Sequence, residues 1–596
     1  MLNIFNSFKE QFFDVVQKIA SANKIEISEK DFANFTVEPT KEKSHGDLAC
    51  NIAMTMSKKF SHIDSLNNPR KLAEKIISEL KNDNIAKIDI AGPGFINLFL
   101  KNEIFYDIIS QLLKNKSFIF PNLGHSEKIN LEYASPNPTG PIHVGHTRGA
   151  IYGDVLASLL SKVGFNVLKE YYINDAGSQI MTLIKSAYLR YLEASGEKIE
   201  ITEGLYPGEY LIEVGKALYS KFQDNIKHKS EEDYIPLIRE FVVDEMVEMI
   251  KSDLLALGIK HDSYFSEKEN LHDQNKIPQT IKILEEQGLI YEGKLETPKT
   301  EKGVGAKDFK MPEGYDEKDQ TLFKSTSFGD DQDRVVRKAD GSYTYFGADL
   351  AYIKSKFERG ATKFIMPLGY DHAGYIKRLT AATKALTNDK AELKIILCQM
   401  VKFVKDGEPL KMSKRAGNFI TARQVIEEVS ADALRFIMLS RKNDTPFDFD
   451  LNKVIEQSKD NPIFYVQYAH ARCCSVIRQF HATFENEKLD EINDTVLKNL
   501  TDETEIELIK KIISFPRVVE LSATTFEPHR INFYLQELSA IFHALWNKGG
   551  ENPELKFIIK DNLEITKARI YMINALRIVI STGLDIFNIK ALEEMR

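Results

Sequence analysis

Hydrophobic residues recur along the first hundred positions with a period that changes from helical to strand-like. Between residues 2 and 23 they return every three or four positions, which predicts an amphipathic helix at the start of the chain. Gly92-Pro93-Gly94 interrupts a later alternating stretch and predicts a bend between two strands. The elements expected here are helices at 2–23, 47–60, 69–80 and 103–114, and two strands within 85–100. They form a small α+β unit, and we place an N-terminal domain at residues 1–110.

Residues 111–440 alternate between strand-like and helical patterns, which favours a parallel sheet built from βαβ units. One strand ends near Tyr133, a helix beginning at His143 and His146 ends before Gly164, and a second strand is expected at 166–173. Further strands are expected at 343–345, 364–368 and 395–404. Residues 178–292 are mostly helical and too long for a crossover, and 299–340 predicts a hairpin-rich or mobile segment. We therefore interpret about 178–340 as an inserted region.

Beyond residue 430 the apolar periodicity is helical throughout, with long patterns at 433–439, 453–479, 508–521, 532–546 and 565–582. This pattern predicts a helical bundle at 441–596. The fold class expected for the whole chain is α/β. It combines a Rossmann-like parallel-sheet domain, an N-terminal α+β domain and a C-terminal all-α bundle.

Composition limits the possibilities without choosing among them. The 596 residues exceed one hydrophobic core, and a net charge of −8 neither indicates nor excludes a nucleic-acid partner, because the local field decides binding. The four cysteines lack metal or redox spacing, so we expect reduced thiols and no structural metal. No signal pattern and no run of eighteen apolar residues occurs, which predicts a cytoplasmic protein without a membrane segment.

The first candidate for chemistry is the strand, turn and helix that contain His143, Gly145 and His146. Unpaired N–H groups in the first turn of a helix attract phosphate, and imidazoles three residues apart can donate to its oxygens. Gly145 leaves room for a flat base. A solvated helix end or a metal-binding pair remains an alternative for two histidines at this spacing.

The second candidate is the cluster Lys411-Met412-Ser413-Lys414, which precedes a helix expected to open at Thr421. Thr421 and Gln424 form a capping-box pattern. The lysines thus belong to a short loop that could close over a polyphosphate. Taken alone, such a cluster is also typical of a solvated surface.

A third set of polar residues follows apolar strands, where α/β proteins bind their substrates. Carboxylates that approach from fixed directions suit a planar cationic guanidinium. Each residue alone could also be a cap or a turn former. The set consists of Glu132, Asn137, Tyr345, Asp349 and Asp371.

Together these stretches resemble the class I aminoacyl-tRNA synthetases, and in particular the arginyl-tRNA synthetase family. The resemblance runs nearly end to end, from His45-Gly46-Asp47 and Gly92-Pro93-Gly94 through Tyr172-Ile173-Asn174-Asp175-Ala176-Gly177 to Asp432-Ala433-Leu434-Arg435. It implies activation of L-arginine by ATP, with Mg²⁺ accompanying the nucleotide, and transfer of arginine to tRNA(Arg). We expect a monomer.

The resemblance also implies residue roles. ATP binding falls to His143, Gly145, His146, Lys411, Met412, Ser413 and Lys414, of which the histidines and lysines are catalytic. Arginine binding falls to Glu132, Asn137, Tyr345, Asp349, Asp371 and His372. The N-terminal domain would contact the tRNA elbow, and the bundle would bind the anticodon through Tyr534 and Met595.

Two alternatives stay open. Another class I ligase is disfavoured because a cysteine enzyme would need zinc-binding thiolates, and a glutamate pocket should carry arginines rather than acids. A non-catalytic RNA-binding relative is disfavoured because both motifs keep their histidines and lysines.

Overall fold

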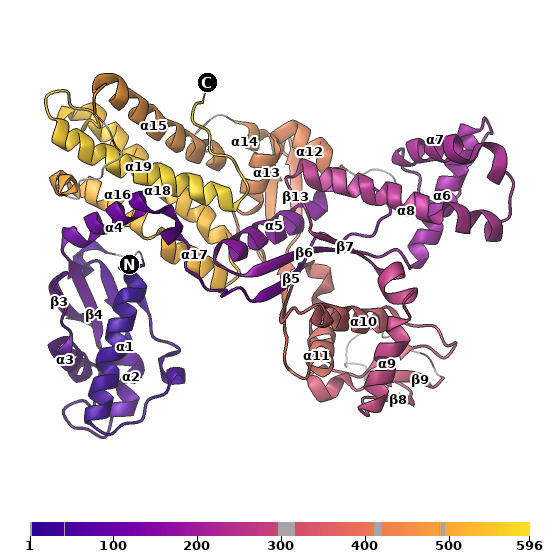
Figure 1. Ribbon diagram of the computed structural model, residues 1–596, viewed down its shortest axis with the longest axis horizontal. Helices are drawn as coiled ribbons and strands as arrows, with labels where there is room; N and C mark the ends of the chain where they lie inside the picture. Colours follow the sequence, from indigo (N-terminus) through magenta and orange to yellow (C-terminus); the bar gives the residue numbers. More distant parts are fainter. Residues whose placement is uncertain are drawn as a thin grey trace.

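The computed structural model describes residues 3–40, 42–295, 316, 318–409, 420–456, 458, 460–487, 489 and 495–595. An N-terminal domain, a central sheet with its insertion and a C-terminal helical bundle follow one another along the chain (Figure 1). Lys411, Met412, Ser413 and Lys414 lie outside the described residues, as does most of the stretch between 296 and 317.

A five-stranded parallel sheet forms the centre of the molecule. Its strand order is β12-β11-β5-β6-β7, and every neighbouring pair is parallel. The strands are β5 (Lys128–Glu132), β6 (Asn166–Ile173), β7 (Ser263–Ser266), β11 (Lys363–Gly369) and β12 (Glu392–Cys398). Helix α5 (Thr147–Lys162) covers one face, and α10 (Tyr345–Glu358) and α11 (Ile376–Thr387) cover the other (Figure 1). The Rossmann-like parallel sheet expected from the sequence is confirmed.

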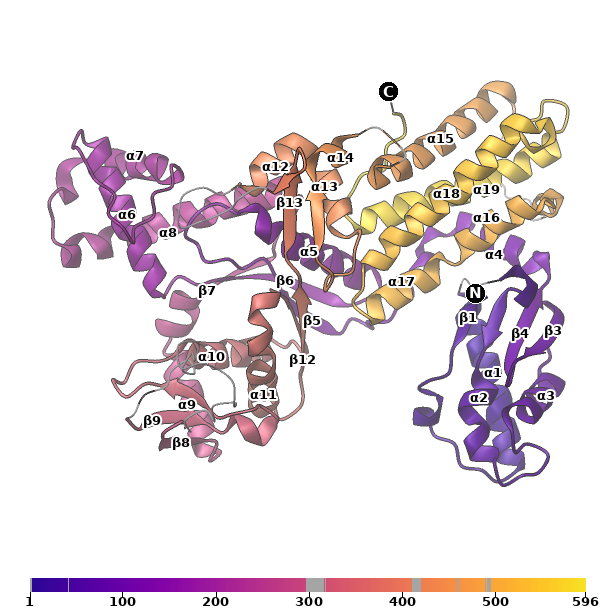
Figure 2. The same cartoon turned by 180° about the vertical axis from the view of Figure 1, so that it is seen from behind.

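The insertion departs from expectation in one respect, because β7 belongs to the central sheet and pairs with β6 from Glu170 to Ile173. The other inserted elements project from the sheet, with α6 and α7 at one extreme of the molecule and α8 leading from them back to the centre (Figure 2). Strands β10, β9 and β8 form a separate antiparallel sheet. The inserted elements are α6 (Ser178–Ala194), α7 (Tyr210–Phe222), α8 (Glu231–Ala256), α9 (Lys276–Glu286), β8 (Ile290–Gly293), β9 (Gln320–Phe323) and β10 (Arg334–Arg337).

The N-terminal domain packs helices on an antiparallel sheet of order β1-β2-β4-β3. The helix expected at 47–60 is wrong at its start, because residues 48–50 pair with both neighbouring strands instead. The tyrosyl hydroxyl of Tyr106 donates to the Leu500 carbonyl at 2.6 Å and joins this part of the chain to the bundle. The elements are α1 (Ile4–Ala22), β1 (Val37–Pro39), β2 (Leu48–Cys50), α2 (Ile52–Met56), α3 (Pro69–Glu79), β3 (Ile85–Ala91), β4 (Phe95–Leu100) and α4 (Asn102–Lys114).

Two expected strands are also corrected. Residues 343–345 form no strand, because Thr344 caps helix α10 through a hydrogen bond from the Gly347 N–H, and Tyr343 makes a single bridge to Arg337. The run 395–404 contains the end of β12 and most of a second strand, β13 (Val401–Lys405), which leaves the central sheet. β13 pairs with β14 (Glu408–Pro409) and, in parallel, with β15 (Phe447–Asp450).

The C-terminal part is a helical bundle, although β15 makes the expectation of an entirely helical chain after residue 430 wrong. The pattern at 508–521 is divided at Ser514 into two helices, and that at 453–479 is divided between 455 and 462. The helices are α12 (Ala422–Val429), α13 (Ala431–Met438), α14 (Leu451–Ile455), α15 (Pro462–Thr483), α16 (Glu503–Ile513), α17 (Phe515–Thr524), α18 (His529–Glu551) and α19 (Leu563–Ile586).

A buried ion pair joins the bundle to the sheet domain. Arg435 of α13 donates to the Asp154 carboxylate on α5 at 2.6 Å, to the Phe587 carbonyl at 2.6 Å and to the Leu257 carbonyl at 2.8 Å. Asp154 also accepts the Tyr133 hydroxyl at 3.0 Å. These bonds connect the end of α19, the end of α8 and the segment that follows β5.

Candidate functional site

The two histidines of the first motif lie in the turn between β5 and α5. His143 caps a short 3₁₀ turn (Val144–His146), and its Nδ1 accepts the Gly145 N–H at 3.1 Å. The imidazoles of His143 and His146 stack, with ring centroids 3.6 Å apart. Because Nδ1 of His143 accepts, the neutral ring carries its hydrogen on Nε2.

The packing of His143 against the turn leaves no room for a side chain at Gly145. A Cβ built at residue 145 would lie 2.9 Å from Cε1 and 3.0 Å from Nδ1 of His143. Gly149, in the following helix α5, has no atom outside its own helix backbone within 4 Å of a built Cβ. The sequence could suggest a small residue at 145, but only the structure shows that its neighbour is the imidazole itself.

The chain that follows the lysine cluster returns directly to this turn. The Val144 N–H donates to the Ile420 carbonyl at 3.0 Å, and the Ala422 N–H donates to the Ile142 carbonyl at 2.8 Å. Asp253 of α8 accepts from the Ile142 N–H at 3.1 Å and from Arg423 at 3.2 Å. The capping box of Thr421 and Gln424 is present as expected.

Two adjoining pockets open at the carboxyl ends of the strands. One, of about 430 Å³, is lined by His143, His146, Tyr206, Pro136 and Thr139. The other, of about 410 Å³, contains Glu132, Tyr345, Asp349, Tyr172 and Asn174. Ser135, Asn137, Gln179 and His372 line both. The described residues thus bring imidazoles and carboxylates to neighbouring cavities.

The carboxylates of the second pocket come from β5 and α10. Tyr345 and Asp349 lie in the first two turns of α10, four residues apart on one face, so the expectation that they follow a strand is wrong. Glu132 ends β5 and is 7% exposed. Its Oε2 accepts the Lys356 ammonium at 2.6 Å. Sequence reasoning missed Lys356, although its position seven residues after Asp349 places both on the same helix face.

A second buried carboxylate supports this wall of the pocket. Glu170 of β6 accepts both guanidinium nitrogens of Arg359, the Asn130 amide at 2.9 Å and the Tyr352 hydroxyl at 2.8 Å. Burial alone would raise its pKa, but the hydrogen bond from Arg359 and the charges of Lys356 and Arg359 lower the pKa of Glu170 to about 2. Glu170 is therefore a permanent anion beneath Tyr352.

The remaining residues expected to contact arginine differ in their position relative to the cavities. Asn137 donates to the Gln179 side chain at 2.9 Å between the two pockets, and His372 lines both. The Asp371 side chain is 77% exposed, and its carboxylate lies 3.6 Å from His372. The structure brings His372 to the cavity and leaves Asp371 beside it.

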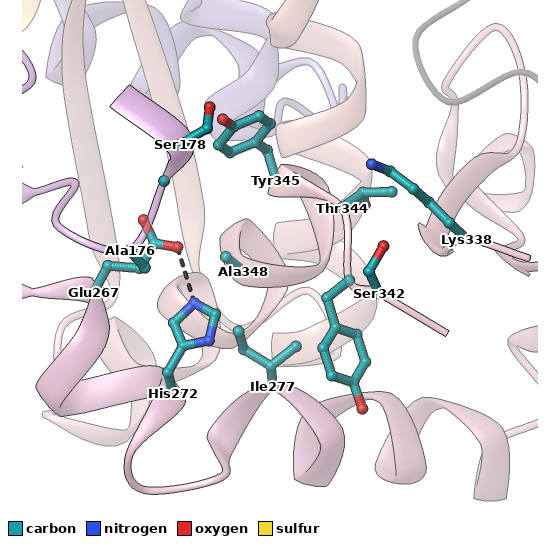
Figure 3. A pocket seen from close by; sticks show the side chains of 12 residues that line it. Ala176, Ser178, Glu267, His272, Ile277, Lys338, Ser342, Thr344, Tyr345 and Ala348 are labelled. Carbon is teal, nitrogen blue, oxygen red and sulfur yellow. Dashed lines mark hydrogen bonds and ion pairs between the residues drawn. The ribbon is translucent and has the colours of Figure 1, made fainter. Parts of the chain in front are cut away.

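A third pocket adjoins the acidic one and shares Gly177 and Tyr345 with it. Figure 3 shows the Tyr345 ring directed toward Ser178, and the Glu267 carboxylate bound to His272 at 3.1 Å on the opposite side. Burial and the Glu267 charge raise the pKa of Tyr172 well above its ordinary value. Because Tyr345 lines both cavities, its aromatic side chain forms part of the partition between them. It is 54% exposed.

The two expected tRNA contacts in the bundle have different surroundings. Tyr534 is 2% exposed, donates to the Lys511 carbonyl at 2.7 Å and stacks on Phe515. Stacking of a base on Tyr534 is not compatible with this conformation, because protein atoms already cover the ring. Met595 lies partly exposed near the end of the chain.

No group of three or more His, Cys, Asp or Glu side chains in the described ranges could hold a metal ion. Within those ranges no helix has the length and apolar character needed to cross a bilayer. All four cysteines are buried free thiols.

Four family models match successive parts of this chain. The model for the arginyl-tRNA synthetase N-terminal domain matches residues 6–100, and that for the class I (R) catalytic domain matches 108–297. A second class I model, for synthetases of I, L, M and V, matches 341–450, and the DALR anticodon binding domain matches 466–595.

Individual proteins similar to this chain have names or titles from the same family. An arginine–tRNA ligase from Rhizobium meliloti is 46% identical over 601 residues, covering 100% of both chains. A structure from Campylobacter jejuni assigned to the arginyl-tRNA synthetases is 33% identical, with a TM-score of 0.70, and covers 83% of this chain and 100% of its own. The arginyl-tRNA synthetase of Thermus thermophilus has the same fold, with a TM-score of 0.72 at 18% identity, covering 99% of this chain and 100% of its own.

The match of residues 108–297 to the class I (R) catalytic domain, together with the parallel sheet that carries the histidine turn, makes this chain a class I aminoacyl-tRNA synthetase. With a full-length relative at 46% identity, the chain belongs to the arginyl-tRNA synthetase family.

Proposed function

We propose that this chain is an arginine–tRNA ligase whose two adjoining pockets hold ATP and L-arginine during formation of arginyl-adenylate. The arginine carboxylate attacks the α-phosphorus of ATP, pyrophosphate leaves, and the arginyl group then passes to the terminal ribose of tRNA(Arg). The carboxylate is itself the nucleophile, so the protein contributes positioning and stabilisation of phosphate charge.

Arginine binds, in this proposal, in the cavity that contains Glu132 and Asp349. A guanidinium carries five N–H donors in one plane, and two carboxylates on separate elements can accept from different directions. Tyr345 and Asn137 line the same cavity, with His372 at its junction with the imidazole pocket. Of the residues proposed to bind arginine, Asp371 contributes least, because its side chain is directed largely to solvent.

ATP binds, in this proposal, against the turn that holds His143, Gly145 and His146. Lys411 and Lys414, with Met412 and Ser413 between them, would contact the phosphates. The observation that supports this pairing is the direct hydrogen bond between the Val144 N–H and the Ile420 carbonyl, since only five residues separate Lys414 from Ile420. Class I synthetases use ATP with Mg²⁺. The described residues lining the imidazole pocket include no carboxylate, which suits an ion held by the phosphates.

The N-terminal domain and the bundle are proposed to bind tRNA(Arg) at its elbow and anticodon, with Met595 as a contact in the bundle. We further propose that the chain acts as a monomer in the cytoplasm, where its buried thiols would stay reduced.

The test is exchange of labelled pyrophosphate into ATP, measured with each amino acid in turn, with and without tRNA. Exchange that depends on arginine supports the proposal. Exchange with a different amino acid would overturn the assignment of the acidic pocket, and none with any amino acid and tRNA would favour a non-catalytic RNA-binding protein.

A further inference from the structure

Lys356 lies behind the proposed arginine pocket, and no motif in the sequence assigns it a role. Its side chain is 1% exposed, and its ammonium contacts the Glu132 carboxylate at 2.6 Å. The same nitrogen lies 4.2 Å from the centre of the Tyr352 ring. A lysine is rarely buried so completely, and when it is, a partner compensates its charge.

The groups around Glu132 form a sequence of alternating charge. Lys356 and Tyr352 come from α10, and Tyr352 donates to Glu170 on β6. Arg359, just beyond α10, binds Glu170 from the other side. Asp349, Tyr172 and His372 line the pocket in front of Glu132. Lys356 is the cation in direct contact with Glu132 in this arrangement.

A carboxylate with no fixed partner can turn among several orientations, and only some of them direct its oxygens toward a guanidinium. The contact with Lys356 holds the Glu132 carboxylate in one orientation before any substrate arrives. A carboxylate has two oxygens with about four acceptor directions, so the single bond to Lys356 leaves acceptor capacity for a ligand. The lysine therefore fixes the direction of the Glu132 carboxylate.

We propose that Lys356 is a positioning residue for arginine recognition, acting through Glu132. This inference rests on the proposed arginine pocket. Lys356 does not touch the substrate, so its removal should weaken arginine binding while leaving ATP binding nearly unchanged.

The test measures KM for arginine, KM for ATP and kcat in pyrophosphate exchange with tRNA present. K356M should raise the arginine KM by about tenfold to a hundredfold, the span of one charge-assisted hydrogen bond, with the ATP KM within about twofold. K356R, which keeps the charge, should recover part of this loss. K354M is the matched control, because Lys354 pairs with Glu358 at the surface of the same helix and should leave both constants unchanged.

A double-mutant cycle separates this role from a purely structural one. If Lys356 acts through Glu132, the variant carrying both K356M and E132Q should have the arginine KM of E132Q alone, a clear departure from additivity. A merely structural ion pair would instead lower the melting temperature of K356M without changing its arginine KM at temperatures where it is folded. That result, additive effects of the two substitutions, or tighter arginine binding by K356M would overturn the inference.

The design also distinguishes failure of the pocket from failure of this inference. If E132Q and D349N both leave the arginine KM unchanged, the pocket assignment is wrong. If both raise it and K356M does not, only the role of Lys356 is wrong. Citrulline, a neutral analogue, gives a second readout: K356M should narrow the ratio of the citrulline inhibition constant to the arginine KM, since a Glu132 carboxylate that is no longer held in one direction favours the cation less.

Discussion

Substituting Gly145 with alanine tests whether the geometry of the histidine turn carries catalysis. The added methyl carbon would stand 2.9 Å from Cε1 of His143, and ordinary van der Waals contact begins near 3.4 Å. The imidazole must therefore move by about half an ångström or rotate away. Either movement weakens the hydrogen bond from the residue 145 N–H to Nδ1 and the stack on His146.

The expected loss can be bounded from both sides. Removing one preorganised donor to a developing charge typically costs roughly 10²–10³ in rate, and a misplacement of about 1 Å can cost roughly 10²-fold. We therefore expect G145A to reduce the rate of adenylate formation about 10²-fold. The free energy of unfolding should change by less than about 1 kcal/mol, because a side chain relieves the contact and residue 145 has no positive φ.

The assay is pyrophosphate exchange with arginine and tRNA, beside a denaturant titration of the same preparation. G149A is the matched control. Gly149 lies in helix α5, just after the turn that contains Gly145, and a methyl group there meets no atom outside its own helix backbone within 4 Å. It should keep the wild-type rate and gain up to about 1 kcal/mol from the removal of a helical glycine. A wild-type rate in G145A, or equal losses in both variants, would refute the reasoning.

Three further predictions concern the phosphates, the domain junction and pH. H146A and K414A should each lower adenylate formation by roughly 10²–10³ with little change in arginine affinity; a normal rate in either variant would remove that residue from the ATP site. R435M should lower the free energy of unfolding by about 3–5 kcal/mol in a denaturant titration, because the buried Asp154 carboxylate loses its 2.6 Å contact with Arg435 and keeps the Lys169 ammonium at 3.9 Å; an unchanged value would show that the Arg435 pair is dispensable. Burial lowers the pKa of His261 to about 4 from 6.5, so the unfolded chain takes up its proton first, and stability fully present above pH 6.5 is lost as pH falls toward 4. In calorimetry H261Q should therefore show a smaller fall in melting temperature between pH 7 and pH 5 than the wild type; an equal or larger fall would exclude His261 as a contributor.

The elements that sequence periodicity predicted best are those that bury one face. Both ends of the strand at 166–173 were predicted correctly. The capping box was recognised because Thr421 and Gln424, which are three residues apart, bind each other's backbone N–H groups. β2 and β15 were missed because short strands obtain their stability from partners far away in the chain: Ala49 pairs with both Glu38 and Asn97, and Phe449 pairs with Phe403. No local pattern contains that information.

In the candidate site, too, some residues were predicted from the sequence and others were not. Glu132, Asn137, Asp349, His143 and His146 were singled out from sequence, and the structure gathers them around two adjoining cavities.

Lys356 and Tyr534 show what the sequence did not contain. The role of Lys356 depends on a contact 224 positions away, and a single lysine on a helix gives no sign of it. Tyr534 was assigned to a base by resemblance alone, whereas burial against Phe515 is decided by the packing of two helices.

The most direct measurement is a crystal structure of the chain with tRNA and a non-hydrolysable arginyl-adenylate analogue. We expect the guanidinium between the carboxylates of Glu132 and Asp349, the phosphate-mimicking group within hydrogen-bond distance of His143 and His146, and the Lys414 ammonium on the same side. Density for the analogue away from these cavities, or a guanidinium that contacts neither carboxylate, would contradict the proposed convergence of imidazoles, amines and acids on one reaction.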